Sequence, residues 1–228
     1  MQNKSIILMS NNYWTLFRFR YQIIKYLIKK DFKVHLIAEM DGYQDKFSSN
    51  NNIICHNVNF SGRSINPINE LRTFFRLKKL LKDIKPLYLF SYTIKPNIYS
   101  GYLCNKFSIN HIPMITGFGY FFNALKKPLR TIIHIILKKS FLHSKEVWFT
   151  NMSDKNYYID NKIIDKSKKT SLIMGAGIDF DNVNITKSNV NTEKTFIMIG
   201  RLLNEKGTSE FIQAAKYFFK FNKYKFIL

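Results

Sequence analysis

The sequence predicts an α/β protein built on a parallel β-sheet, and three observations lead to this fold class. Short apolar runs of strand length alternate with longer segments of helical periodicity along most of the chain. Strands that are joined by helices pair in parallel, with the helices covering both faces of the sheet. Apolar residues make up 46% of the 228 residues, which is enough to form a core and excludes a disordered chain.

The first elements are expected from apolar spacing alone. Residues 6–9 form a short apolar run of strand character. Residues 14–30 carry apolar side chains three and four positions apart, which indicates an amphipathic helix. Residues 33–38 and 52–58 are short strand-like runs, and we expect them to be the second and third strands.

Proline marks the starts of the next helices. Pro67, Pro96 and Pro128 each stand where a helical pattern begins, and proline is tolerated there because the first helical N–H groups have no intrahelical acceptor. The expected helices are residues 67–83, 96–107, 128–143 and 154–160, and the expected strands are residues 87–90, 113–115, 146–150 and 169–173.

A polar stretch separates this set of elements from a second one. Residues 195–199, 208–221 and 225–228 have the pattern of strand, helix and strand. We predict an α/β first domain over residues 1–178, a linker over 179–194, and the start of a second α/β domain over 195–228. Because one βαβ unit cannot cover both faces of its sheet, we expect the second domain to be incomplete and the chain to be truncated at its C-terminus.

The chain is strongly basic, with a formal net charge of +21. Only seven of the 36 cationic residues are Arg, the residue preferred for reading base edges, so we predict no nucleic-acid partner. A basic nucleic-acid-binding protein stays the weaker alternative. The abundance of Lys, Asn and Ile indicates a coding bias as one source of the charge, and anionic phosphates or an anionic membrane are the functional alternative.

The location is expected to be cytoplasmic. Two cysteines, Cys55 and Cys104, exclude a disulfide framework. No apolar run reaches the roughly 18 to 20 residues that span a bilayer, and the first residues lead into a strand rather than a signal-peptide core. The helix over residues 128–143 carries Arg130, Lys138 and Lys139 beside isoleucines; it either lies on an anionic membrane surface or packs on the core with basic ends.

Candidate site residues follow the strands, because ligands of open parallel sheets bind at the carboxyl ends. Gly200 ends a strand, and Arg201 and Lys206 flank a loop that opens a helix, an arrangement that suits phosphate. An ordinary turn with solvated charges is the alternative. The other candidates at strand ends are Asn12, Thr93, Lys95, Asn97, Gly117 and Gly119.

No metal site is predicted. Asp179 and Asp181 form a DxD pair, but they open the polar linker rather than follow a strand. The five histidines are scattered and lack the spacing of metal ligands.

These segments together resemble glycosyltransferase family 4, whose GT-B fold has two facing Rossmann-like domains. The strongest match is GRLLNEKG at residues 200–207, which follows the family pattern G-R-L-x-x-E-K-G and precedes EFIQAA at 210–215. TIKPNIY at 93–99 and ITGFG at 115–119 look like the bacterial branch that builds surface polysaccharides or lipid-linked oligosaccharides. GAGID at 175–179 is similar to the family stretch before the interdomain linker.

The resemblance implies a retaining transfer of a sugar from a nucleotide-sugar to a lipid-linked glycan acceptor, without a metal or other cofactor. Gly200, Arg201 and Lys206 would bind the donor diphosphate. Asn12, Thr93, Lys95, Asn97, Gly117 and Gly119 would line the cleft on the acceptor side. The protein would act in the cytoplasm, in peripheral contact with the inner surface of the membrane.

The sequence departs from the family pattern at two places. No two of its six glutamates stand eight positions apart, so the E-x7-E pair of the family is absent and the catalytic residues are not assigned. Tyr92 and Thr93 stand where many members have a histidine. We therefore expect little activity from this chain alone, and a non-catalytic binding or scaffold protein is the alternative.

Overall fold

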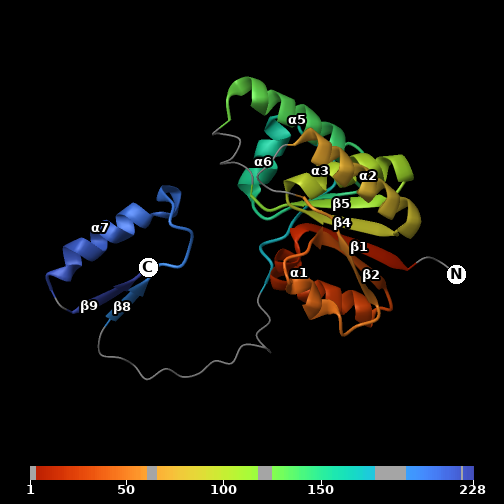
Figure 1. Ribbon diagram of the computed structural model, residues 1–228. Helices are drawn as coiled ribbons and strands as arrows, with labels where there is room; N and C mark the ends of the chain where they lie inside the picture. Colours follow the sequence, from red (N-terminus) through yellow and green to blue (C-terminus); the bar gives the residue numbers. More distant parts are fainter. Residues whose placement is uncertain (1–3, 61–65, 118–124, 178–193, 222) are drawn as a thin grey trace. The chain divides into compact units, whose positions relative to one another are not determined.

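The computed structural model describes residues 4–60, 66–117, 125–177, 194–221 and 223–228 (Figure 1). The chain forms two compact units, Met1–Asp179 and Phe180–Leu228, and each is described by itself.

The first unit contains a seven-stranded sheet in which every neighbouring pair is parallel. The strand order is β3-β2-β1-β4-β5-β6-β7, so the order reverses between β1 and β4. The predicted fold class is confirmed. The strands are β1 (Ser5–Asn12), β2 (Lys33–Glu39), β3 (Ile53–Asn57), β4 (Tyr88–Tyr92), β5 (Asn110–Ile115), β6 (Val147–Phe149) and β7 (Thr170–Leu172).

Helices lie on both faces of this sheet (Figure 1). One face is covered by α1 (Tyr13–Lys29) and the short 3-10 turn η1 (Tyr43–Phe47), and the other by α2 (Pro67–Ile84), α3 (Ile94–Phe107) and α5 (Lys127–Phe141). The short helix α6 (Met152–Asp160) packs with α5 against β5 and β6.

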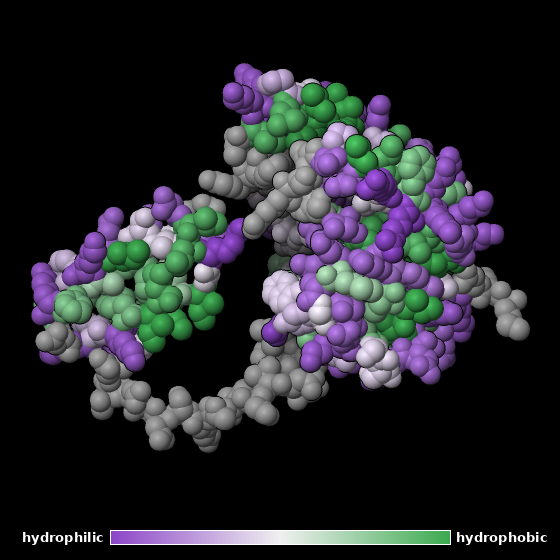
Figure 2. Space-filling model, in the orientation of Figure 1, coloured by the Kyte–Doolittle hydropathy of each residue, from purple (hydrophilic) through white to green (hydrophobic). Residues whose placement is uncertain are grey.

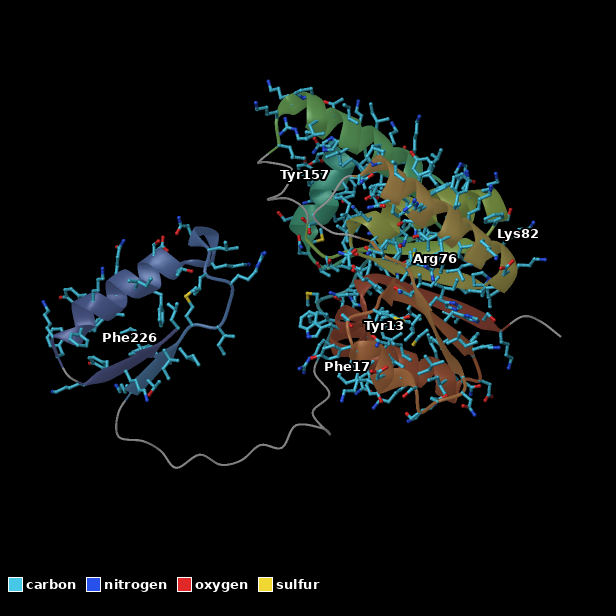
Figure 3. All side chains as sticks on the ribbon, viewed as in Figure 1. Tyr13, Phe17, Arg76, Lys82, Tyr157 and Phe226 are labelled. Atoms are coloured by element: carbon cyan, nitrogen blue, oxygen red, sulfur yellow. The ribbon has the colours of Figure 1, made fainter. Side chains whose placement is uncertain are left out.

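The core follows the alternation of side chains along the buried strands. In β1, Ile6 and Leu8 belong to the cluster under α1, whereas Ile7 and Met9 belong to the cluster under α2 and α3. Figure 3 shows Tyr13 in this α1 layer, and its hydroxyl makes a bifurcated hydrogen bond to the carbonyl oxygens of Leu36 (2.9 Å) and His56 (3.0 Å). The start of α1 is thereby tied to β2 and to the end of β3.

The start of α3 differs from the prediction. The helix begins at Ile94, two residues before Pro96, so the proline occupies the third helical position. This position tolerates proline because the N–H groups of the first turn have no intrahelical acceptor. Thr93 precedes the helix with a φ of 73°, a left-handed value that is rare for a β-branched residue.

Helices α3 and α5 approach each other closely at a glycine. A Cβ atom at Gly101 would lie 2.1 Å from the carbonyl oxygen of Ser140 in α5. No side chain fits there, so Gly101 permits the backbone-to-backbone contact that fixes α5 against α3.

The second unit consists of β8 (Lys194–Ile197), the 3-10 turn η3 (Asn204–Lys206), α7 (Thr208–Phe219) and β9 (Tyr224–Ile227). The two strands pair in parallel with Phe196 opposite Phe226, which are stacked with ring centroids 5.1 Å apart (Phe226 is labelled in Figure 3). Every residue of β8 is exposed, as are Phe219 and Leu228. β8 begins at Lys194, one residue earlier than the predicted strand.

Candidate functional site

A pocket of about 380 Å³ lies at the carboxyl edge of the sheet of the first unit. Its walls come from α1 and from the residues at and after the ends of β4, β5, β6 and β7, which is the edge where open parallel sheets bind ligands. The lining residues are Thr15, Phe19, Arg20, Tyr92, Thr93, Met114, Thr116, Thr150, Gly175 and Ala176.

Arg20 is the cationic residue of this wall, and it is 94% buried. Its guanidinium carbon lies 4.3 Å above the centre of the Tyr92 ring, a cation–π contact worth about 2 kcal/mol when desolvated. One guanidinium nitrogen donates to the carbonyl oxygen of Phe19 (3.0 Å), and another lies 3.3 Å from the sulfur of Met114. Burial lowers the pKa of Arg20, while burial raises the pKa of Tyr92 to about 12 against the opposing effect of Arg20.

Arg20 was missed by reasoning from the sequence, although the pattern contains a signal for it. Leu16, Arg20 and Ile24 stand four residues apart, and all three are buried on the same stripe of α1. A cation in the middle of an apolar stripe is unusual, because charged residues are rarely buried without a partner.

Thr93 is the predicted residue that lines the pocket. Its hydroxyl donates to Asn11 Oδ1 (2.9 Å) and also contacts the carbonyl oxygen of Tyr92. A non-glycine residue with φ of this sign carries about 1–3 kcal/mol of backbone strain, and such residues concentrate at functional sites.

Asn12 caps helix α1. Its Oδ1 accepts hydrogen bonds from the Thr15 backbone N–H (3.0 Å) and from the Thr15 hydroxyl (2.6 Å). The side chain therefore satisfies the first turn of α1 and, through Thr15, positions one wall of the pocket.

Asn97 is buried in a polar network rather than directed to solvent. Its Oδ1 accepts from the Ser91 hydroxyl (2.7 Å), and its Nδ2 donates to the carbonyl oxygen of Met114 (3.1 Å). His111 Nε2 lies 2.8 Å from the Ser91 oxygen, and the Ser144 hydroxyl lies 3.2 Å from His111 Nδ1. The network joins α3 to β4 and β5, and burial lowers the pKa of His111 to about 3, so its ring stays neutral.

Lys95 is compensated by a carboxylate. Its Nζ lies 2.8 Å from Glu70 Oε1 in α2, and the Tyr99 hydroxyl donates to the other oxygen of the same carboxylate. Lys95 and Asn97 thus point to different neighbours, because residues two apart on a helix lie on different faces.

Gly117 follows β5 with a φ of 124°, which only glycine adopts readily, and its backbone is exposed. Gly119 lies outside the described residues. Asp179 and Asp181 also lie outside them.

The described residues contain no group of three or more His, Cys, Asp or Glu side chains arranged to hold a metal ion. His35 and His56 do pair, with Nδ1 and Nε2 2.9 Å apart. Burial and the neighbouring His56 lower the pKa of His35 to about 4.

The second unit carries Gly200, Arg201 and Lys206 on the turn between β8 and α7. The Leu203 N–H donates to the carbonyl oxygen of Arg201 (2.8 Å), and Gly207 enters α7 with a φ of 78°. Arg201 and Lys206 are exposed, and neither takes part in the two ion pairs found among the described residues, Lys95–Glu70 and Lys169–Glu146. Two exposed cations therefore stand on one short turn before a helix, and neither pairs with a carboxylate that the structure describes.

Comparison with known proteins gives the family. The model of glycosyl transferase 4-like proteins matches residues 5–151. A curated relative, the N,N'-diacetylbacillosaminyl-diphospho-undecaprenol alpha-1,3-N-acetylgalactosaminyltransferase of Campylobacter jejuni, is 28% identical over 221 residues. The match covers 88% of this chain and 57% of the relative, so the chain spans little more than half of that protein's length.

Solved structures agree on the fold. Sucrose-phosphate synthase of Thermosynechococcus elongatus superposes with a TM-score of 0.68 at 10% identity, covering 98% of this chain and 62% of its own. A glycosyltransferase of Rickettsia africae superposes with a TM-score of 0.61 at 16% identity, covering 98% of this chain and 68% of its own. At these identities the likeness shows the fold alone, and the fold is of the expected GT-B type. Since the family model covers well over half of the residues, the chain belongs to the glycosyl transferase 4-like family.

Proposed function

We propose that this protein transfers a sugar from a nucleotide-sugar to a lipid-linked glycan in surface polysaccharide synthesis, with retention of the anomeric configuration. The family match over residues 5–151 is the observation that carries the proposal. The Campylobacter jejuni relative supports the acceptor class, because its name specifies an undecaprenol diphosphate-linked sugar. Neither a metal nor another cofactor is part of the proposed reaction.

The donor diphosphate binds at the turn of the second unit. Negative charge develops on the diphosphate as its bond to the sugar breaks, and preorganised cations stabilise that charge. Arg201 offers a planar fork of donors for phosphate and Lys206 offers a point charge. Both are exposed and free of carboxylate partners among the described residues, so they are available to a ligand.

The acceptor binds in the pocket of the first unit. Its aromatic and small lining residues suit a sugar ring, and Thr116 supplies a hydroxyl group after the carboxyl end of β5. The Thr93 hydroxyl donates to Asn11, so it offers a ligand its oxygen as an acceptor. Gly117 lets the backbone pass close to a ligand beside this pocket.

The protein works at the cytoplasmic face of the membrane, in peripheral contact with it. Helix α5 exposes Leu129, Ile132 and Ile135, each about half exposed, next to Lys138 and Lys139 (the apolar surface over α5 in Figure 2). No helix among the described residues is long and apolar enough to cross a bilayer. An apolar stripe beside lysines suits binding to an anionic lipid surface without insertion across it.

Vesicle sedimentation tests the membrane contact. The double variant I132N/I135N is expected to bind vesicles containing phosphatidylglycerol at least ten-fold less than the wild type. Met40→Asn serves as the control, because Met40 is 46% exposed in a loop remote from α5 in the sequence. Equal loss in both variants would contradict the assignment of the contact to α5.

Donor binding tests the function itself. Calorimetric titration of the chain with UDP and a panel of UDP-sugars is expected to show binding that weakens at least ten-fold in Arg201→Ala and in Lys206→Ala. Lys216→Ala is the matched control, since Lys216 is exposed in the last turn of α7. Absence of nucleotide-sugar binding by the wild type, or binding unchanged in both variants, would refute the donor site.

Transfer is expected to be slow in the 228-residue chain by itself. All of β8 and several aromatic side chains of the second unit are exposed, so few buried contacts hold the turn that is proposed to bind the donor. Transfer assays with lipid-linked acceptors measure this directly, and the anomeric proton of any product reports on retention.

A further inference from the structure

Arg20 is a buried cation that pairs with no carboxylate in the part of the chain that the structure describes. The two ion pairs found among the described residues involve Lys95 and Lys169, so no described carboxylate compensates Arg20. Its Nε is fully buried and meets no hydrogen-bond acceptor among the residues that the structure describes. Of its five N–H donors, one meets a carbonyl oxygen and one meets a thioether sulfur, which is a weak acceptor.

This arrangement is unfavourable for the chain alone. A guanidinium keeps its charge under ordinary conditions, and its removal from water is unfavourable unless an anion and hydrogen-bond acceptors replace the water. The Tyr92 ring replaces only part of that interaction. An apolar residue between Leu16 and Ile24 would complete the buried stripe, so the helix itself has no need of arginine there.

The position of Arg20 points to a ligand. Arg20 lines the pocket at the carboxyl edge of the sheet. Three other polar residues of the wall already donate their hydroxyl groups within the protein, Thr15 to Asn12, Thr93 to Asn11 and Thr150 to Ile115. Among these lining residues, Arg20 is therefore the one with several N–H donors that meet no described acceptor.

We propose that Arg20 is the anion-binding residue of this pocket and that its ligand is a phosphate group. The guanidinium fork matches two phosphate oxygens, and the low polarity of the wall strengthens the attraction. The identity of the phosphate rests on the proposed function, in which it belongs to the diphosphate of the lipid-linked acceptor. Arg20 would then fix the acceptor at the end of the sheet, while Arg201 acts on the donor in the other unit.

Titration with inorganic pyrophosphate tests the site. The wild-type chain is expected to bind pyrophosphate and to gain thermal stability from it. In the Arg201→Ala background, which removes the proposed donor site, adding Arg20→Met is expected to weaken binding at least ten-fold. Without ligand, Arg20→Met should unfold at the same or a higher temperature, because an uncompensated charge is removed. Arg18→Met is the matched control, since Arg18 is exposed on the same helix. Pyrophosphate binding that is equal in Arg201→Ala and in the double variant Arg20→Met/Arg201→Ala would overturn the proposal, as would a preference of the Arg201→Ala variant for glucuronate.

A measurement on the wild type covers the case in which Arg20→Met does not fold. The buried Nε–H of Arg20 gives a separate NMR signal, which pyrophosphate should shift and the same concentration of chloride should not. Lack of any shift at saturating pyrophosphate would overturn the proposal. Arg20→Lys keeps the charge without the fork and should bind with intermediate affinity.

Two diphosphates identify the source of the phosphate. Farnesyl diphosphate should lose affinity in Arg20→Met and keep it in Arg201→Ala, whereas UDP should show the opposite pattern. Because these arginines lie in different units, a failure of the Arg20 site leaves UDP binding at Arg201 intact. Pyrophosphate binding at Arg20 without any nucleotide-sugar binding would keep the anion site and refute the proposed function.

Discussion

Gly101→Ala places one methyl group where the backbone of α5 already lies. The added Cβ would stand 2.1 Å from the carbonyl oxygen of Ser140, 2.7 Å from its carbonyl carbon and 2.8 Å from its Cα. Ordinary van der Waals contact begins near 3.4 Å, so the two helices would have to separate by more than 1 Å. All three obstructing atoms belong to backbone, and no rotamer change removes them.

The expected loss of stability follows from two opposed effects. Overpacking of this kind costs about 1–3 kcal/mol, and the immobile backbone favours the upper end. Alanine in a helix recovers about 1 kcal/mol relative to glycine. We therefore expect a net destabilisation of about 2 kcal/mol, which lowers the melting temperature of a protein of this size by about 4–8 °C.

Urea denaturation followed by circular dichroism measures this difference. Asn105→Ala is the control, because Asn105 is exposed on the same helix and feels only the change in helix propensity. A Gly101→Ala variant that is as stable as the wild type, with Asn105→Ala also unchanged, would show that α3 and α5 do not meet at Gly101. The same variant should weaken pyrophosphate binding, since α3 follows Thr93 at the pocket.

Three further outcomes are expected. Because folding lowers the pKa of His111 from 6.5 to about 3, the unfolded chain takes up the proton first. The free energy of unfolding should therefore fall as the pH drops from 6.5 towards 3, by up to about 1.4 kcal/mol per pH unit. Urea denaturation at a series of pH values should show a shallower pH dependence for His111→Asn than for the wild type, and an equal pH dependence would contradict this assignment. Asn12→Ala removes the cap of α1 and should cost about 1 kcal/mol by the same assay. Glu70→Gln leaves Lys95 without its ion pair. Because both side chains are only about a fifth to a quarter exposed, urea denaturation should show a loss of more than about 1 kcal/mol, above the range of fully exposed pairs; a smaller loss would contradict this reasoning.

Periodicity located nearly every helix and strand of the structure. Residues 14–30 repeat their apolar side chains with a helical period, and α1 spans Tyr13–Lys29. The turn η1 was missed, because five residues are too few to display a period. Its signal was the Asp41-Gly42 pair, where Gly42 has a φ of 88° and begins the turn.

The order of the strands in the sheet and the neighbours of individual side chains could not be predicted from the sequence. The pairing of β1 with both β2 and β4 is set by contacts between residues far apart in the chain. Lys95 and Asn97 both follow β4, yet helical geometry turns one towards Glu70 and buries the other beside Ser91. A position after a strand end therefore predicted the region of the pocket, but it did not predict which residues line the pocket.

The net charge of the chain likewise does not predict where an anion binds. A net charge of +21 points to anionic partners without saying where they bind. Most lysines are solvated, and Lys95 is neutralised by Glu70, so these residues add charge without forming a site. Arg20 differs because burial removes water from its guanidinium while no described carboxylate replaces it. A buried cation without a described counter-ion therefore indicates the place of an anion site more precisely than many exposed cations do. For this reason we expect replacement of Arg20 to weaken acceptor binding and to leave donor binding unchanged.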